Sequence, residues 1–282
     1  MPLPVTDNRS IYTPRPCQLL SVTSLTANEK LFQLQLADGS ELQHQPGQFV
    51  QISIPGFTEA PISVASSPTR DGNFELAVRK AGSLTSALHQ LQPGAQLGIR
   101  GPFGRPFQLD ELRGKQLLLI AGGCGLAPLR SLIQYCQDRC DEFASVQIFY
   151  GARSEEDLMF RQELKDWQIG RNFNCRYTVD NKPANSCFDG ETGLITQLLA
   201  NLPIDSSNCC AVIVGPPAMY QPVIASLRQL GLNSAKQIML SLERQMRCGI
   251  GKCGHCTIEH LYCCCDGPIF WLEEVENLRG AL

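Results

Sequence analysis

The chain has 282 residues, of which 43% are hydrophobic, and a formal net charge of −3 at pH 7. This length and composition suffice for roughly two domains with buried cores. The slightly acidic balance predicts no attraction to nucleic acid or to anionic membranes, and no apolar run approaches the ~18 residues of a membrane span.

The cysteine content indicates a reducing compartment. There are fourteen cysteines, and their spacing is not that of a secreted disulfide framework. The N-terminal residues contain no apolar signal-peptide core. We therefore expect a cytoplasmic protein.

Residues 11–108 are predicted to form short strands. The segments CQLLSVTSLTA, LFQLQLA, GQFVQISIP, ISVASSP and FELAVRK are rich in apolar residues, and turn signals such as ADGS, RDGN and PGAQ separate them. Even spacing without a long helix predicts a small antiparallel barrel. The segment SLTSALHQL is its one helical element.

After a junction at 109–114, residues 115–235 alternate between strand and helix patterns. Continuous apolar runs such as QLLLIAGG and CAVIVG are typical of buried parallel strands. Helical patterns follow them in APLRSLIQYCQDRC, DLMFRQELKDW, TGLITQLLANL and PAMYQPVIASLRQLG. This order predicts a doubly wound parallel sheet, and residues 236–282 are expected to carry cysteines on loops.

Glycine-rich turns in the second domain are candidates for nucleotide binding. Glycines between a strand and a helix let a phosphate approach the backbone, and the helix N-terminus favours its charge. A tight turn or simple helix initiation would use the same residues. Arg153, the arginine of YGAR, could hold a phosphate or ribose of the nucleotide, and a solvated surface position explains it equally well. Arg153 and Arg161 are also possible partners of a 2′-phosphate on a bound nucleotide. The candidates are Gly122, Gly123, Cys124, Gly125, Ala127, Pro128, Gly151, Arg153, Gly215, Pro216, Pro217 and Met219.

Two stretches of the first domain are candidates for a second cofactor site. Amides and hydroxyls before a helix can bind a pyrophosphate, although a capped helix start is the simpler interpretation from these residues alone. The candidates are Pro61, Ile62 and Ser63, together with Gly82, Ser83, Leu84 and Thr85.

The last segment contains the pattern C-x4-C-x2-C-x7-C at Cys248, Cys253, Cys256 and Cys264. The first three of these cysteines have the spacing of plant-type [2Fe–2S] sites, in which glycines let the backbone wrap the cluster. A zinc site is the alternative, because Cys253 and Cys256 also form one C-x2-C pair. Spacing alone does not choose among Cys263, Cys264 and Cys265 for the fourth ligand.

These motifs together resemble the ferredoxin–NADP reductase superfamily. Within it the chain is similar to the gamma subunits of cytoplasmic nickel–iron hydrogenases (sulfhydrogenases), to the corresponding subunits of anaerobic sulfite reductases and, more distantly, to the electron-transfer subunit of dihydroorotate dehydrogenase. The stretches that carry the resemblance are EAPISVASSPT, GPFGRPF, AGGCGLAPLRSLI, YGARSEEDLMF, VIVGPPAMY, SLERQMRCGIGKCGHC and DGPIF.

The resemblance implies FAD between barrel and sheet, NAD(P)H at the strand ends, and a [2Fe–2S] cluster on a C-terminal arm near the flavin. It places the fourth ligand two residues before a D-G-P motif, which is Cys264 here. Two departures stand out. The superfamily's Arg-x-Tyr/Phe-Ser motif reads Ala60-Pro61-Ile62-Ser63, and Val214 occupies a position where many relatives have cysteine.

We therefore expect a flavin-binding β-barrel, an α/β nucleotide domain and an iron–sulfur arm. The expected function is electron transfer between NAD(P)H and a partner redox subunit, with hydrogenase favoured over sulfite reductase. Hydride transfer needs no acid–base residue, so no catalytic side chain is predicted. The alternative from another class is a zinc-stabilised, non-redox, nucleotide-binding regulatory subunit.

Overall fold

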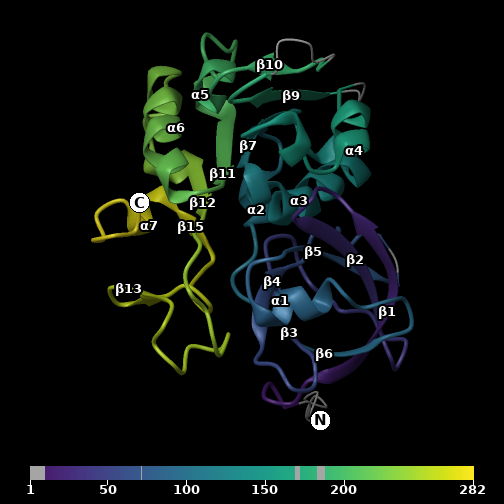
Figure 1. Cartoon of the computed structure of the whole chain (residues 1–282). Coiled ribbons are helices and arrows are strands. Elements are labelled where there is room, and N and C mark those ends of the chain that lie inside the picture. Colours follow the sequence, from purple (N-terminus) through teal and green to yellow (C-terminus); the bar gives the residue numbers. More distant parts are fainter. Residues whose placement is uncertain (1–9, 71, 169–171, 183–187) are drawn as a thin grey trace.

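The structure, a computed structural model, describes residues 10–70, 72–168, 172–182 and 188–282 (Figure 1). The first domain is an antiparallel sheet with strand order β4-β3-β6-β1-β2-β5. A bridge between Val64 and Leu76 joins the end of β4 to β5, so the sheet closes into the predicted barrel. The strands are β1 (Arg15–Ser24), β2 (Glu29–Leu36), β3 (Phe49–Ser53), β4 (Ala60–Ser63), β5 (Phe74–Arg79) and β6 (Gln96–Phe103).

Alternation of side chains fills this barrel. In β5, Phe74, Leu76 and Val78 are buried, while the residues between them are more exposed. Such a period of two directs every second side chain to the core. Helix α1 (Ser83–Leu88) adds Leu84 and Leu88 to the same core.

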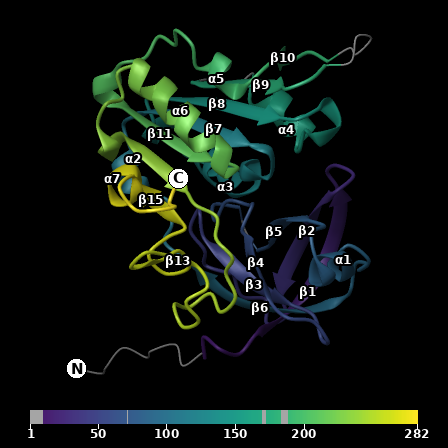
Figure 2. The same ribbon diagram turned by 60° about the vertical axis from the view of Figure 1, so that its left-hand side comes forward.

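The second domain is a mostly parallel sheet with order β10-β9-β8-β7-β11-β12-β15. Leu117 and Leu119 of β7 pack with α3, while Leu118 and Ile120 pack with α6, so the two longest helices cover opposite faces (Figure 2). The predicted doubly wound arrangement is confirmed. Its elements are β7 (Gln116–Gly122), α3 (Leu126–Asp138), β8 (Ser145–Ala152), α4 (Arg161–Asp166), β9 (Phe173–Val179), β10 (Glu191–Thr192), α5 (Ile195–Leu198), β11 (Cys209–Val214) and α6 (Pro217–Gln229), after the junction helix α2 (Leu109–Leu112).

Part of the segment expected to be a separate arm belongs to this sheet. Strand β12 (Ile238–Ser241) runs parallel to β11, and β15 (Ile269–Trp271) pairs antiparallel with β12. The sheet therefore extends past the boundary expected at residue 235, because the apolar run of β12 is buried along its whole length. The remainder holds the hairpin β13 (Thr257–Ile258) and β14 (Leu261–Tyr262) and the helix α7 (Leu272–Val275).

The arm is fastened to the barrel where two distant motifs meet. The residue after GPFG, Arg105, bridges Pro268 of the D-G-P motif in parallel. A Cβ on Gly104 would lie 2.8 Å from Pro268 Cδ, so only glycine permits this approach. Among the described residues, no helix has the length and apolar character needed to cross a membrane.

Candidate functional site

The two glycine-rich turns of the second domain lie side by side. Strands β7 and β11 are parallel neighbours, so the turns at their carboxyl ends meet at one edge of the sheet. A Cβ on Gly125 would lie 2.2 Å from Val214 O, and one on Gly122 would lie 2.6 Å from Met219 Sδ. Gly125 therefore permits a close approach to the backbone of β11, and Gly122 leaves room for the side chain of Met219.

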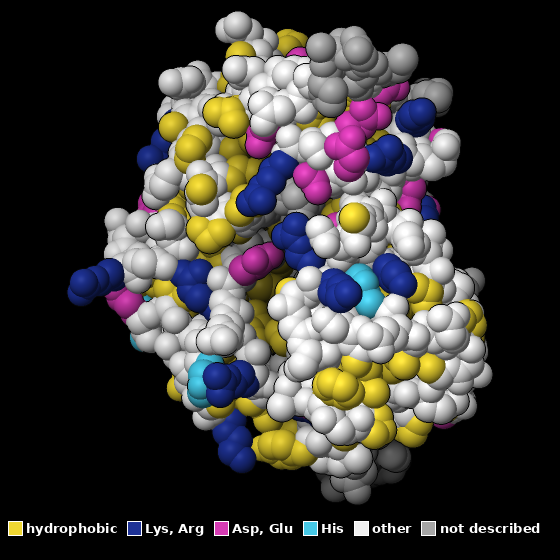
Figure 3. All heavy atoms as spheres, in the orientation of Figure 1, with side chains coloured by type: hydrophobic (Ala, Val, Ile, Leu, Met, Phe, Trp, Pro, Cys, Tyr) yellow, Lys and Arg dark blue, Asp and Glu magenta, His cyan; other side chains and the backbone are white. Residues whose placement is uncertain are grey.

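A cavity of about 520 Å³ opens beside these turns. One wall comes from the ends of β7, β8, β9 and β11, and the other comes from Asn28, Glu29 and Arg79 of the barrel. Figure 3 shows that basic and acidic side chains gather around a hollow between the two halves of the molecule. The volume lies within the range of small-molecule and cofactor sites.

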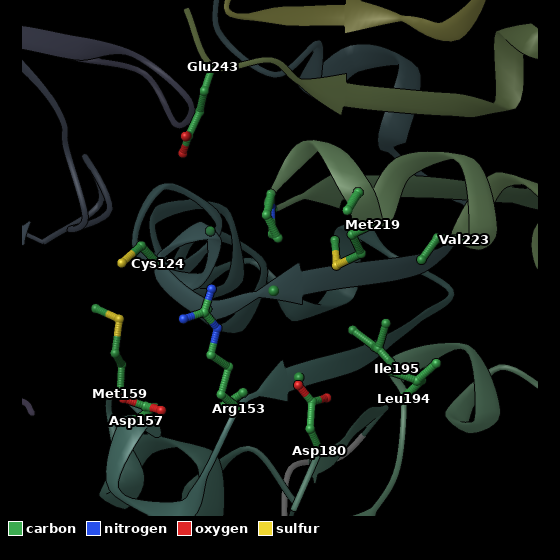
Figure 4. Close-up of a pocket in the computed structure, with 18 of the residues that line it drawn as sticks. Cys124, Arg153, Asp157, Met159, Asp180, Leu194, Ile195, Met219, Val223 and Glu243 are labelled. Atoms are coloured by element: carbon green, nitrogen blue, oxygen red, sulfur yellow. The ribbon is translucent and has the colours of Figure 1, made fainter. Parts of the chain in front are cut away.

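Most of the predicted nucleotide residues line this cavity. They are Gly122, Gly123, Cys124, Gly125, Gly151, Arg153, Gly215, Pro216 and Met219. Three others do not line it, namely Ala127 and Pro128 in the first turn of α3 and Pro217 at the start of α6. Arg153 reaches into the cavity opposite Met219 (Figure 4).

Several charged residues of the cavity were missed by the sequence reasoning. Glu29 forms an ion pair with Arg79 at 2.8 Å and accepts a hydrogen bond from Cys124 Sγ at 3.3 Å. Burial, with the neighbouring charge of Glu29, raises the pKa of Cys124 to about 12, so the thiol is a donor and not a nucleophilic thiolate. The bond from Cys124 to Glu29 joins residues 95 positions apart in the sequence, and no local pattern indicates it.

Glu243 enters the cavity from the segment after β12 (Figure 4). Its side chain is open to the cavity but has protein around it. This partial burial raises the pKa of Glu243 by more than the charge of Arg79 lowers it, so the net shift is upward. The stretch SLERQ entered the sequence reasoning only as part of the resemblance. The position of Glu243 directly after an apolar run was the signal available, since such positions meet at the edge of a parallel sheet.

The predicted flavin residues lie outside this cavity. On β4, Ile62 pairs with Val50, a residue of the barrel core, whereas Pro61 pairs with Gln51 and Ser63 with Phe49 on the outer face. Leu84 is buried in the barrel. Thr85 Oγ1 accepts hydrogen bonds from the amides of Ala81 and Gly82, both at 2.9 Å, so it caps its own helix. A role of these residues in flavin binding stays a prediction.

The four predicted cysteine ligands lie close to one another on the loop. Side-chain contacts join Cys248 to Cys253 and Cys256 to Cys264. Backbone amides point at the sulfurs as well, with Lys252 N 3.3 Å from Cys248 Sγ and Gly251 N 3.1 Å from Cys264 Sγ. Among the described residues, no three Cys, His, Asp or Glu side chains converge on one point that could hold a single metal ion.

The neighbours of Cys264 are placed differently. Cys263 is fully buried and its Sγ donates to Leu242 O at 3.2 Å, so it points into the domain core. Cys265 is exposed, and its Sγ lies 3.8 Å from that of Cys264. Gly249 and Gly251 have positive φ angles of 74° and 70°, which let the loop turn its amides toward the sulfurs.

Comparison with known families matches all three parts of the chain. The oxidoreductase FAD-binding domain family matches residues 16–107, and the oxidoreductase NAD-binding domain family matches residues 119–224. The iron–sulfur cluster binding domain of dihydroorotate dehydrogenase B matches residues 243–276.

Similar proteins cover nearly the whole chain. The gamma subunit of sulfhydrogenase 1 from Pyrococcus furiosus is 39% identical over 98% of this chain and 96% of its own length. The gamma subunit of sulfhydrogenase 2 from the same organism is 38% identical over 96% and 99%. A probable electron-transfer subunit of dihydroorotate dehydrogenase B from Methanothermobacter thermautotrophicus is 32% identical over 83% and 81%.

A solved structure supports the fold. The structure of an NADH-dependent reduced ferredoxin–NADP oxidoreductase, studied for flavin-based electron bifurcation, superimposes with a TM-score of 0.73. The match covers 92% of this chain and 88% of the other at 24% identity. At that identity, the likeness speaks for the architecture alone.

Proposed function

The chain belongs to the FAD- and NAD-binding oxidoreductases of the ferredoxin-reductase type, and we propose that it passes electrons between NAD(P)H and a partner redox subunit. One observation carries this proposal. The cavity beside the two glycine turns opens onto the barrel, and the same chain places an iron–sulfur binding segment against that barrel. A nucleotide site, a flavin domain and a cluster loop thus adjoin each other.

The residues of the cavity suit a nicotinamide dinucleotide. The glycine turns leave backbone amides accessible to a pyrophosphate, and Arg153 adds a cation for a phosphate or ribose. The barrel wall and the turns bound this space on two sides. FAD would supply the chemistry that accepts two electrons together and releases them singly, while this chain supplies the binding groups and their orientation.

The cysteine loop suits a two-iron cluster. A [2Fe–2S] cluster takes four thiolate ligands, and here side-chain contacts join Cys248 to Cys253 and Cys256 to Cys264. We assign Cys248, Cys253, Cys256 and Cys264 as its ligands. The amides of Gly251 and Lys252 already point at two of these sulfurs, as expected for groups that stabilise negative charge on a cluster.

An anaerobic visible spectrum, titrated first with NADH and then with NADPH, tests the function. Flavin and iron–sulfur absorption that bleaches with one nucleotide would support the proposed electron transfer and identify the electron donor. Zinc without iron, sulfide or flavin, even after reconstitution, would support the regulatory alternative instead.

Replacing Cys264 by serine tests the ligand set. The variant should lose most of its iron and sulfide while keeping flavin, because serine is a poor ligand for a cluster that thiolates bind. Cys265→Ser is the matched control, because that thiol lies beside Cys264 but is exposed, and it should keep the cluster. Full iron content in Cys264→Ser together with loss of iron in Cys265→Ser would identify Cys265 as the fourth ligand instead.

For the partner, we propose a nickel–iron hydrogenase in a reducing cytoplasm. The sulfhydrogenase gamma subunits match at higher identity and over more of the chain than the dihydroorotate dehydrogenase subunits. The match to the iron–sulfur domain of dihydroorotate dehydrogenase B favours that enzyme as the second candidate. Nickel in the native complex would support the first, dihydroorotate oxidation the second, and a sirohaem chromophore would point to sulfite reductase.

A further inference from the structure

A row of three residues crosses the outer face of the barrel. Gln51 of β3 pairs with Pro61 of β4 on one side and with Arg100 of β6 on the other. The neighbours of Gln51 on its own strand, Val50 and Ile52, fill the barrel core, so the row faces outward. One end of the row is the strand predicted to contact the flavin, and the other end touches the cysteine loop.

Arg100 fastens that loop to the barrel. Its Nη2 donates to Cys248 O at 3.0 Å, and its Nη1 donates to Ile11 O at 2.8 Å. Glu59 is its counter-ion and accepts from Nε at 2.8 Å and also from Nη2. The guanidinium is buried, with only 5% of its side chain exposed. A charge pair with a buried cation and a partly exposed carboxylate therefore lies directly behind the first cysteine of the pattern.

Gln51 adds a second, independent feature. It is fully buried, yet neither its Nε2 nor its Oε1 has a hydrogen-bond partner within the described part of the chain. The amide lies against the cysteine loop, since a Cβ on Gly249 would be 3.0 Å from Gln51 Nε2. Buried amides are nearly always paired, so the amide is positioned to meet a group bound between barrel and loop.

Electrostatics gives this arrangement a function. A cluster that gains an electron gains negative charge, so a nearby cation favours the reduced form and a nearby carboxylate opposes it. An amide N–H beside the cysteine loop, such as that of Gln51, favours the reduced form as well. Because Arg100 is buried and Glu59 is only partly exposed, salt screens these effects less than it screens a pair on the open surface.

We propose that Arg100, Glu59 and Gln51 form a seat on the barrel wall that positions the cysteine loop and sets the reduction potential of its cluster. This inference rests on the proposed iron–sulfur function. It goes further in naming barrel residues, far from the ligands in sequence, that control the step from flavin to cluster. These are positioning residues, because none of them is a ligand of the metal.

The test is a redox titration of the cluster followed by electron paramagnetic resonance. Glu59→Gln keeps an acceptor for Arg100 but leaves its charge uncompensated, so the potential should rise. Arg100→Gln leaves the carboxylate uncompensated, so the potential should fall, whereas Arg100→Lys should stay near the wild type. Each charge change should alter the reduced-to-oxidised ratio about tenfold at fixed potential, which equals 59 mV for one electron.

Two further variants complete the design. Gln51→Leu removes the amide and should lower the potential by less than Arg100→Gln does. Glu191→Gln is the matched control, because Glu191 also receives two bonds from one arginine, Arg176, but sits on the opposite edge strand of the nucleotide sheet. Its cluster potential should not change.

Opposite shifts in Glu59→Gln and Arg100→Gln support the proposal, since a merely structural role would not reverse sign with charge. Shifts in the same direction, or none, at unchanged iron and sulfide content would overturn it. If Arg100→Gln loses its cluster, Glu59→Gln and Gln51→Leu are compared instead. The potential should rise in Glu59→Gln and fall in Gln51→Leu. A wild-type protein that binds no iron or sulfide after anaerobic reconstitution would instead overturn the proposed function.

Discussion

The two contacts of the barrel with the nucleotide domain are built in opposite ways. Along α3 the contact is closed, and the cavity around Glu29, Arg79 and Glu243 is open. At the closed contact, Arg130 donates to Glu75 of the barrel at 2.6 Å, to Glu163 of α4 at 2.8 Å and to Ala65 O at 3.0 Å. At the open one, a cavity of about 520 Å³ separates charges of the two domains.

The closed contact continues along α3 beyond Arg130. Ser131 Oγ donates to Ser66 O at 2.6 Å, and Gln134 Oε1 accepts from Ser67 N at 3.0 Å. Buried polar groups that are fully paired define one geometry between two elements. The difference teaches that one side of the interface fixes the angle between the domains, while the other keeps charges available for a ligand. Variants on the two sides should therefore fail in different ways.

The largest effect is expected on the closed side. Arg130→Met should lower the free energy of unfolding by about 3 kcal/mol, because it leaves two largely buried carboxylates without their cation. Chemical denaturation measures this value. Arg113→Met is the control, since Arg113 also pairs with two carboxylates but is half exposed, and it should cost less than about 1 kcal/mol. Equal losses in both variants would mean that the α3 contact has no special importance.

On the open side, Arg153→Gln should weaken NAD(P)H binding without affecting stability. The loss should be about tenfold, as is typical when a hydrogen bond from a charged group is removed. Titration calorimetry on the flavin-loaded protein gives the affinity. Arg161→Gln serves as the control, because Arg161 does not line the cavity and donates to Glu155 O at 2.5 Å. If Arg161→Gln weakened NAD(P)H binding and Arg153→Gln did not, Arg161 and not Arg153 would be the arginine that binds the nucleotide.

The smallest effect is a pH dependence at Glu243. Since its pKa is raised in the folded chain, the folded state keeps this proton at pH values where the unfolded chain has lost it. Stability is therefore lost as pH rises from about 4.3, the ordinary glutamate pKa, toward the raised value. Glu243→Gln should remove this loss and gain less than about 1 kcal/mol above that window, because the side chain opens to water.

Denaturation at a series of pH values tests this sign. Glu156→Gln is expected to differ from wild type in the opposite direction. The pKa of Glu156 is lowered by a hydrogen bond from its own amide and by Ser154, so wild-type stability at this position is lost as pH falls. If Glu243→Gln had the same free energy of unfolding as the wild type at every pH, the carboxyl of Glu243 would not contribute to the pH dependence of stability and the prediction would be wrong.

Local signals in the sequence indicated which residues would meet at the cavity. Nine residues that the sequence predicts to bind a nucleotide line it, since glycine turns follow apolar strands and the carboxyl ends of parallel strands meet at one edge of the sheet. The cysteine spacing likewise marked a loop whose amides turn toward the sulfurs. The four-residue α5 was expected to be longer, since the helical pattern of TGLITQLLANL continues past its end.

The tertiary structure alone decided the contacts between distant segments. The pairing of Glu29 with Cys124, the bond from Arg100 to the loop of Cys248 and the joining of β12 to the sheet leave no local pattern in the chain. Local propensity and hydrophobic period act over a few residues and so fix elements, turns and the fold class. Charges that meet across a domain interface are brought together only when the chain packs, so their partners are chosen by the fold and not by neighbours in sequence.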